Sequence, residues 1–220
     1  YFRDFVETGY YSAAYKFWDV LAFVPSVIGI ALYPFFAERL SRGLKDEVRL
    51  GLETYTRYMI AVALPLALGA YILAPRLATL PGEEFAPAAP ALWLLVAAVS
   101  VLLIYSPANS LVISQQTKMA TKITGSTLLL NIVLNIVLLP RYGFVAAAAV
   151  TVLSELNQAF WYWLLIRRRI IDYHFFRHFT KPILAAAGLA DLLQATLNPP
   201  MAAWLLNFSI TPSILGGQSE

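Results

Sequence analysis

Long stretches without charged residues dominate this chain and constrain its fold more than any other feature. Residues 20–37, 58–75, 85–117 and 123–140 contain no Asp, Glu, Lys or Arg, and residues 142–166 contain only Glu155. An α-helix needs about 20 apolar residues to cross a hydrocarbon core of roughly 30 Å. The first stretch reaches that length when it is extended back to Tyr10. We therefore predict an all-α, polytopic transmembrane helix bundle with five spans and a weaker sixth over 182–197, which Asp191 interrupts.

Composition excludes most other classes of protein. Hydrophobic residues make up 59 % and charged residues 13 % of the chain, against roughly 45–50 % and about 25 % in ordinary soluble proteins. A soluble enzyme, a disordered chain and a nucleic-acid binder are excluded on this ground. A membrane β-barrel would need alternating segments of about 10 residues, which these continuous runs do not provide. Cysteine is absent, so disulfides and thiol chemistry are excluded as well.

No motif in the chain points to catalysis, a cofactor or a metal. There is no glycine-rich phosphate loop and no nucleophile elbow, and the predicted outer loops are too short to hold a glycosyl-transfer site. His174 and His178 have the i, i+4 spacing of a zinc pair, but three phenylalanines accompany them, as in an interfacial amphipathic helix. We expect no enzymatic activity, no cofactor and no metal site.

The basic residues indicate the orientation of the spans. Twelve of the sixteen Lys and Arg residues fall in alternate connections, and such connections face the cytoplasm in most membrane proteins. On this basis loops 37–57, 115–122 and 167–181 are cytoplasmic and Tyr1 lies outside. We expect residues 1–9 to form an outer loop, 10–170 the transmembrane bundle, 171–181 a cytoplasmic interfacial loop, and 182–220 the weak sixth span with an irregular tail. A first span that enters from outside also implies further spans upstream.

Two charged residues lie within the first span. Lys16 and Asp19 share one helix face with Ser12, since the spacing is i, i+4, i+7. A charge inside a span is costly and by default marks a functional site. Lys16 would line a water-filled cavity and meet an anionic headgroup. Alternatively, Lys16 extends to the outer interface or is neutralised by Asp19.

The fifth span carries a polar stripe around Glu155. Thr151, Glu155, Gln158 and Tyr162 recur at steps of four and three residues and so lie on one face. A carboxylate within a span is a candidate to bind a coupling proton or cation. The alternative is a protonated glutamic acid that holds two helices together by a hydrogen bond.

The fourth span carries a second polar stripe. Thr124, Thr127, Asn131 and Asn135 share one face. Two asparagines at i, i+4 either line a cavity and bind sugar hydroxyls or join neighbouring helices. Prolines at positions 25, 34, 65 and 107 interrupt spans one to three, and they permit the bends that a transporter uses when it rocks between states.

Three segments resemble one known family. Residues 9–16 (GYYSAAYK) resemble the start of the helix that opens the C-terminal half of lipid-linked oligosaccharide flippases, the polysaccharide-biosynthesis branch of the multidrug/oligosaccharidyl-lipid/polysaccharide exporter superfamily. Residues 82–88 (GEEFAPA) look like the outer loop of that family. The pattern N-x-x-L-N-x-x-L-L-P-x-Y-G-x-x-A-A-A over 131–148 is similar to its most recognisable signature, although Ala146 stands where that family more often has Gly.

The resemblance covers about residues 1–185 and implies a function. It implies the C-terminal lobe of a two-lobe flippase that moves undecaprenyl-diphosphate-linked oligosaccharide across a bacterial or archaeal plasma membrane. Its partners would be the lipid-linked glycan, membrane lipid, H⁺ or Na⁺ as coupling ion, and the missing N-terminal lobe. In this scheme Lys16 attracts the diphosphate, while Asn131, Asn135 and Gln158 offer hydrogen bonds to the glycan.

Three rival functions remain open. A cation-coupled antiporter of drugs or organic cations from the same superfamily would depend on Glu155 and Asp19 rather than on Lys16. A membrane scaffold or truncated half-protein would not transport at all. A membrane glycan polymerase is disfavoured by the short outer loops.

Overall fold

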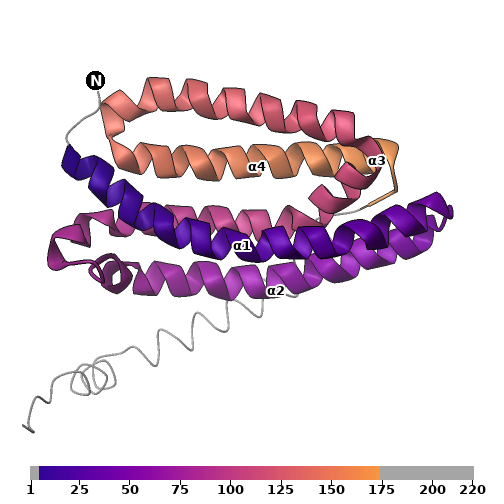
Figure 1. Cartoon of the computed structure of the whole chain (residues 1–220), viewed down its shortest axis with the longest axis horizontal. Coiled ribbons are helices and arrows are strands. Elements are labelled where there is room, and N and C mark those ends of the chain that lie inside the picture. Colours follow the sequence, from indigo (N-terminus) through magenta and orange to yellow (C-terminus); the bar gives the residue numbers. More distant parts are fainter. Residues whose placement is uncertain (1–4, 174–220) are drawn as a thin grey trace, which may run out of the picture. The chain divides into compact units, whose positions relative to one another are not determined.

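The computed structural model describes residues 5–173, and every regular element in that range is a helix (Figure 1). The elements are α1 (Phe5–Ser41), α2 (Lys45–Ala78), the short 3₁₀ helix η1 (Glu83–Ala88), α3 (Ala89–Tyr142) and α4 (Phe144–Arg169). All four α-helices are long and apolar enough to cross a membrane. The predicted all-helical class is therefore confirmed. The predicted sixth span, Asp191, and the pair His174 and His178 lie outside the described residues.

Helix α3 reverses its direction at Gln116. This residue has φ −134° and ψ 48°, outside the helical region, although the helix continues on both sides of it. The reversal explains why Tyr162 contacts two distant parts of α3: its ring lies 5.9 Å from that of Tyr105, and its hydroxyl 3.4 Å from Thr124 Oγ1. In a straight helix residues 105 and 124 would be about 28 Å apart. The two segments of α3, 89–115 and 117–142, run in opposite directions with α4 between them (Figure 1).

Two boundaries differ from those predicted. The region 115–122, expected as a loop, is helical except for the break at Gln116, because a single non-helical residue suffices to reverse the chain. Residues 5–9, expected as part of an outer loop, already belong to α1. Both differences have one cause: absence of charge locates apolar segments but does not show where helical hydrogen bonding stops.

Three connections lie at the same end of the bundle. The α1–α2 turn, the reversal at Gln116 and the end of α4 meet there, whereas η1 and the α3–α4 turn lie at the other end (Figure 1). A cluster of buried side chains joins the elements at the first end, and its largest members include Phe36, Leu52, Tyr162 and Tyr173. Burial raises the pKa of Tyr173 to about 12.

The α1–α2 turn is held by a small aromatic and charged cluster. The guanidinium carbon of Arg39 lies 3.8 Å from the centre of the Phe35 ring, and Arg39 Nε lies 3.3 Å from the Glu47 carboxylate. The edge of Tyr55 meets the same Phe35 ring at 5.7 Å. Gly51 faces this ring so closely that a Cβ there would lie 2.5 Å from it. The ion pair and the Phe35–Tyr55 ring contact join α1 to α2, while the cation–π contact holds Arg39 against Phe35 within α1.

The first segment of α3 forms the centre of the bundle. It packs against α1, α2 and α4, and most of its side chains from Ala91 to Val112 are fully or partly buried. Ser110 Oγ donates to the carbonyl of Gly29 on α1 at 2.9 Å, a close helix–helix contact of the kind that small residues permit. The helices continue through all four prolines singled out in the sequence. At Pro107 the freed carbonyl of Leu103 accepts a hydrogen bond from Ser106 Oγ at 2.9 Å.

Two glycines enable the turns at 80–82 and 140–143, where proline and glycine in the sequence already predict turns. Gly82 precedes η1 with φ +155°, and Gly143 joins α3 to α4 with φ +68° and ψ −160°. Residues with a side chain rarely adopt such angles. Gly143 is also close to Glu7, whose carboxylate lies beside the N-terminus of α4, where negative charge is favourable.

Candidate functional site

A ladder of side-chain hydrogen bonds joins the second segment of α3 to α4. Asn131 Nδ2 donates to Ser154 Oγ at 2.9 Å, and Asn157 Nδ2 donates to Thr127 Oγ1 at 2.9 Å. Asn135 Nδ2 donates to the Asn131 side-chain and main-chain oxygens, both at 3.0 Å. Ser154 and Thr127 are buried. The stripe on the second segment of α3 thus faces α4, but it meets Ser154 and Asn157, which lie outside the stripe predicted for α4. Asn131 contacts the neighbouring helix, whereas Asn135 bonds within its own helix.

A second polar group centres on Glu155. Tyr105 Oη, from the first segment of α3, donates to Glu155 Oε2 at 2.6 Å. Tyr105 is only 4 % exposed and packs against Tyr162, which is 1 % exposed. Gln158 Nε2 donates to the Tyr162 hydroxyl at 3.3 Å. Glu155 is therefore held from a helix 50 residues away in sequence, and its carboxylate belongs to a connected set of hydroxyl and amide groups.

Helix α1 extends this polar group. The Tyr15 hydroxyl is close enough to both Asp19 and Glu155 to interact with them electrostatically. The Tyr11 side chain interacts with Thr151 on α4 by a side-chain hydrogen bond. Asp19 and Glu155, which come from different helices, thus both act on the Tyr15 side chain.

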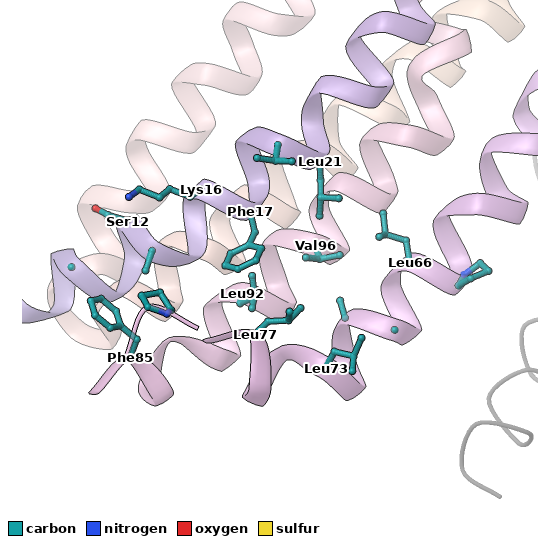
Figure 2. A pocket seen from close by; sticks show the side chains of 17 residues that line it. Ser12, Lys16, Phe17, Leu21, Leu66, Leu73, Leu77, Phe85, Leu92 and Val96 are labelled. Atoms are coloured by element: carbon teal, nitrogen blue, oxygen red, sulfur yellow. The ribbon is translucent and has the colours of Figure 1, made fainter. Parts of the chain in front are cut away.

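Lys16 lies apart from that group, at the rim of a pocket between α1 and α2 (Figure 2). The pocket has a volume of about 840 Å³, and η1 and the start of α3 complete its walls. Ser12 and Lys16 are the only polar residues among the 17 that line it. Both are exposed, and their polar ends point to the same side, away from Phe17 and Leu92 (Figure 2). The site combines one positive charge with an almost entirely apolar hollow.

The predicted pairing of Lys16 with Asp19 does not occur. Among the described residues, the ion pairs join side chains of the α1–α2 turn and of α2, and Lys16 is in none of them. Both residues are exposed on α1. The Lys16 charge is therefore available to a ligand.

The structure divides the predicted site residues into three places. Asn131 and Asn135 belong to the α3–α4 ladder. Gln158 and Glu155 belong to the tyrosine group, and Asp19 interacts with Tyr15 of that group. Lys16 lines the pocket. Sequence reasoning missed Tyr105 and Asn157. A tyrosine in the middle of a predicted span was the available signal for Tyr105. Asn157, two residues after Glu155, falls outside the predicted polar stripe that contains Glu155.

No group of three or more His, Asp or Glu side chains capable of holding a metal occurs within residues 5–173.

Comparison with known proteins finds a distant relative among membrane proteins. No protein-family model matches the chain. An uncharacterized membrane protein of Methanocaldococcus jannaschii is 29 % identical over 136 residues, a stretch that covers 61 % of this chain and 27 % of that protein. This chain therefore matches about a quarter of the relative's length. Together with the long apolar helices, the likeness supports the class of helical membrane protein.

Proposed function

We propose that this chain is part of a transporter that flips undecaprenyl-diphosphate-linked oligosaccharide across a plasma membrane. Such a substrate has an anionic diphosphate, a polar glycan and a hydrocarbon tail. The observation that carries the proposal is the exposed Lys16 ammonium on an apolar helix, beside a pocket of about 840 Å³. A charge in a span is expensive, and no acidic partner among the described residues offsets this one.

The proposed topology has five crossings in the described range: α1, α2, the two segments of α3, and α4. Each segment of α3 exceeds the roughly 20 residues that a span requires. The α1–α2 turn, the Gln116 reversal and the end of α4 lie at one end of the bundle and carry most of the basic residues. This end would face the cytoplasm, with a sixth crossing over 182–197 and the other lobe completing a multi-pass flippase.

The polar residues would act in different steps. Lys16 would attract the diphosphate. Gln158 and Asn135 would offer hydrogen bonds to sugar hydroxyls, because their side-chain oxygens accept no hydrogen bond from other described residues. Asn131, already bonded to Ser154, would mainly hold α3 against α4. Glu155 would bind the coupling proton or Na⁺, and Tyr105 would position it.

The test is a Lys16→Ala variant of the full-length protein in a strain that lacks the native gene. We expect loss of the surface glycan, with partial recovery in Lys16→Arg, since the positive charge is restored. Lys122→Ala is the matched control, because Lys122 is exposed at the opposite end of the bundle. Wild-type glycan output from Lys16→Ala would overturn the assignment.

A cation-coupled antiporter of drugs or organic cations is the second candidate. The electrostatic interaction of Tyr15 with both Asp19 and Glu155 favours it, since carboxylates near an aromatic ring suit a cation. The two functions differ in which residue is essential. Drug resistance that is lost in Glu155→Gln and kept in Lys16→Ala would favour the antiporter.

A further inference from the structure

The pocket beside Lys16 is elongated along two helices. Its lining runs from Gly9 to Leu21 along α1 and from Pro65 to Leu77 along α2. Both stretches correspond to about 18 Å at 1.5 Å per residue. Half of a hydrocarbon core of roughly 30 Å is about 15 Å. The pocket therefore extends along the helices for about the depth of one leaflet.

Along this length the hollow is lined almost entirely by apolar side chains, with Lys16 and Ser12 at its rim. Val20 is 73 % exposed and Leu73 45 %, so the pocket is open to the side from which a lipid would enter.

The charge at the rim selects the headgroup. Helical side chains tilt toward the helix N-terminus, so Lys16 reaches back toward the turn of Ser12, as Figure 2 shows. This is the end of α1 near Gly9 and Phe85, where the pocket begins. A headgroup placed there would have a positive charge within reach and the apolar groove beneath it.

Two glycines keep the groove open. A Cβ built at Gly9 or Gly69 would meet no atom within 4 Å, and both residues line the pocket from opposite walls. Glycine within a helix costs about 0.8–1.0 kcal/mol relative to alanine. At neither position does a neighbouring side chain lie so close that glycine is required.

We propose that this pocket binds one hydrocarbon chain of an anionic membrane phospholipid, with Lys16 at its phosphate. The lipid is a phospholipid of the leaflet, and it would compete with the transported molecule of the proposed function for Lys16. Its binding does not depend on whether the chain moves a glycan.

Native mass spectrometry of the full chain in a non-ionic detergent tests the proposal. The protein is mixed with phosphatidylglycerol or phosphatidylcholine, and retained lipid is counted. We expect the wild type to retain phosphatidylglycerol in preference. Gly69→Leu should fill the groove and weaken retention at least tenfold, as should Gly9→Leu on the other wall. Gly125→Leu is the matched control, because Gly125 also has open space around it but lies outside the pocket.

Lys16→Gln should abolish the preference for phosphatidylglycerol over phosphatidylcholine while leaving a chain bound. Three results would overturn the proposal: wild-type retention in both Gly69→Leu and Gly9→Leu, equal retention of the two lipids by the wild type, or no retained phospholipid at all. No glycan is measured, so failure here is distinct from failure of the proposed transport. Circular dichroism of each variant checks that it has folded.

Discussion

Removing the Tyr105 hydroxyl should loosen α4 from the centre of the bundle. In Tyr105→Phe the ring remains, so its contact with Tyr162 is kept and the lost group is the donor 2.6 Å from Glu155 Oε2. Tyr105 is 4 % exposed, and water does not readily replace the donor. Because the bond joins residues 50 positions apart, its loss acts on helix packing rather than on a single helix.

The expected magnitude follows from the geometry and the medium. Hydrogen bonds to charged groups contribute about 1.5–3 kcal/mol in soluble proteins. Side-chain hydrogen bonds between membrane helices average about 0.6 and reach about 1.7 kcal/mol, because the unfolded chain in a membrane also finds partners. The short distance and the burial of Tyr105 place this bond at the upper end of the membrane range. We expect a loss of about 1–1.5 kcal/mol in the free energy of unfolding.

A double-mutant cycle in mixed detergent–SDS micelles measures this value. Tyr105→Phe, Glu155→Ala and the double variant are unfolded with SDS, and the coupling energy is taken from the four free energies. Tyr58→Phe is the control, because Tyr58 is 62 % exposed, and its effect should stay within about 0.5 kcal/mol. A coupling energy below about 0.3 kcal/mol would refute the assigned role of Tyr105.

Two glycine substitutions test the turns by the same unfolding measurement. Gly143→Ala should cost about 1–3 kcal/mol, because φ +68° with ψ −160° is open almost only to glycine. Gly125→Ala, in a helix with open space around it, should instead be neutral or stabilising, and equal effects would contradict the argument. Gly51→Ala should cost about 1–3 kcal/mol by forcing the Phe35 ring aside. Phe35→Leu should recover part of that loss, and a harmless Gly51→Ala would show that the ring moves freely.

The helices could be predicted from the sequence because a membrane leaves few alternatives. In a hydrocarbon core every backbone polar group must be bonded internally, so a charge-free run such as 123–140 has to be helical. The predicted turns at 80–82 and 140–143 followed from glycine and proline, whose backbone restrictions are local. None of these inferences needed knowledge of a distant contact.

The reversal in α3 could not be predicted in the same way. Charged residues separate the third and fourth runs, which indicated a loop over 115–122, yet Lys118 and Lys122 lie on regular helix. The break occurs at Gln116 alone, and this position has neither a glycine nor a proline from which a turn could be predicted. Packing determines it: Tyr105 and Thr124 both come to Tyr162 only if the chain turns back between them.

The polar stripes show why periodicity alone does not distinguish a binding site from helix packing. Asn131 and Glu155 satisfy the same sequence criterion, a polar side chain on one face of an apolar helix. Asn131 meets Ser154 from the adjacent helix, whereas Glu155 meets a tyrosine from a third segment and lies near Asp19 through Tyr15. The first arrangement neutralises its polar groups pairwise. In the second, one carboxylate depends on a single hydroxyl from another segment, and this contact changes with the protonation of Glu155. The proposed coupling site is therefore better sought at Glu155 than along the asparagine ladder.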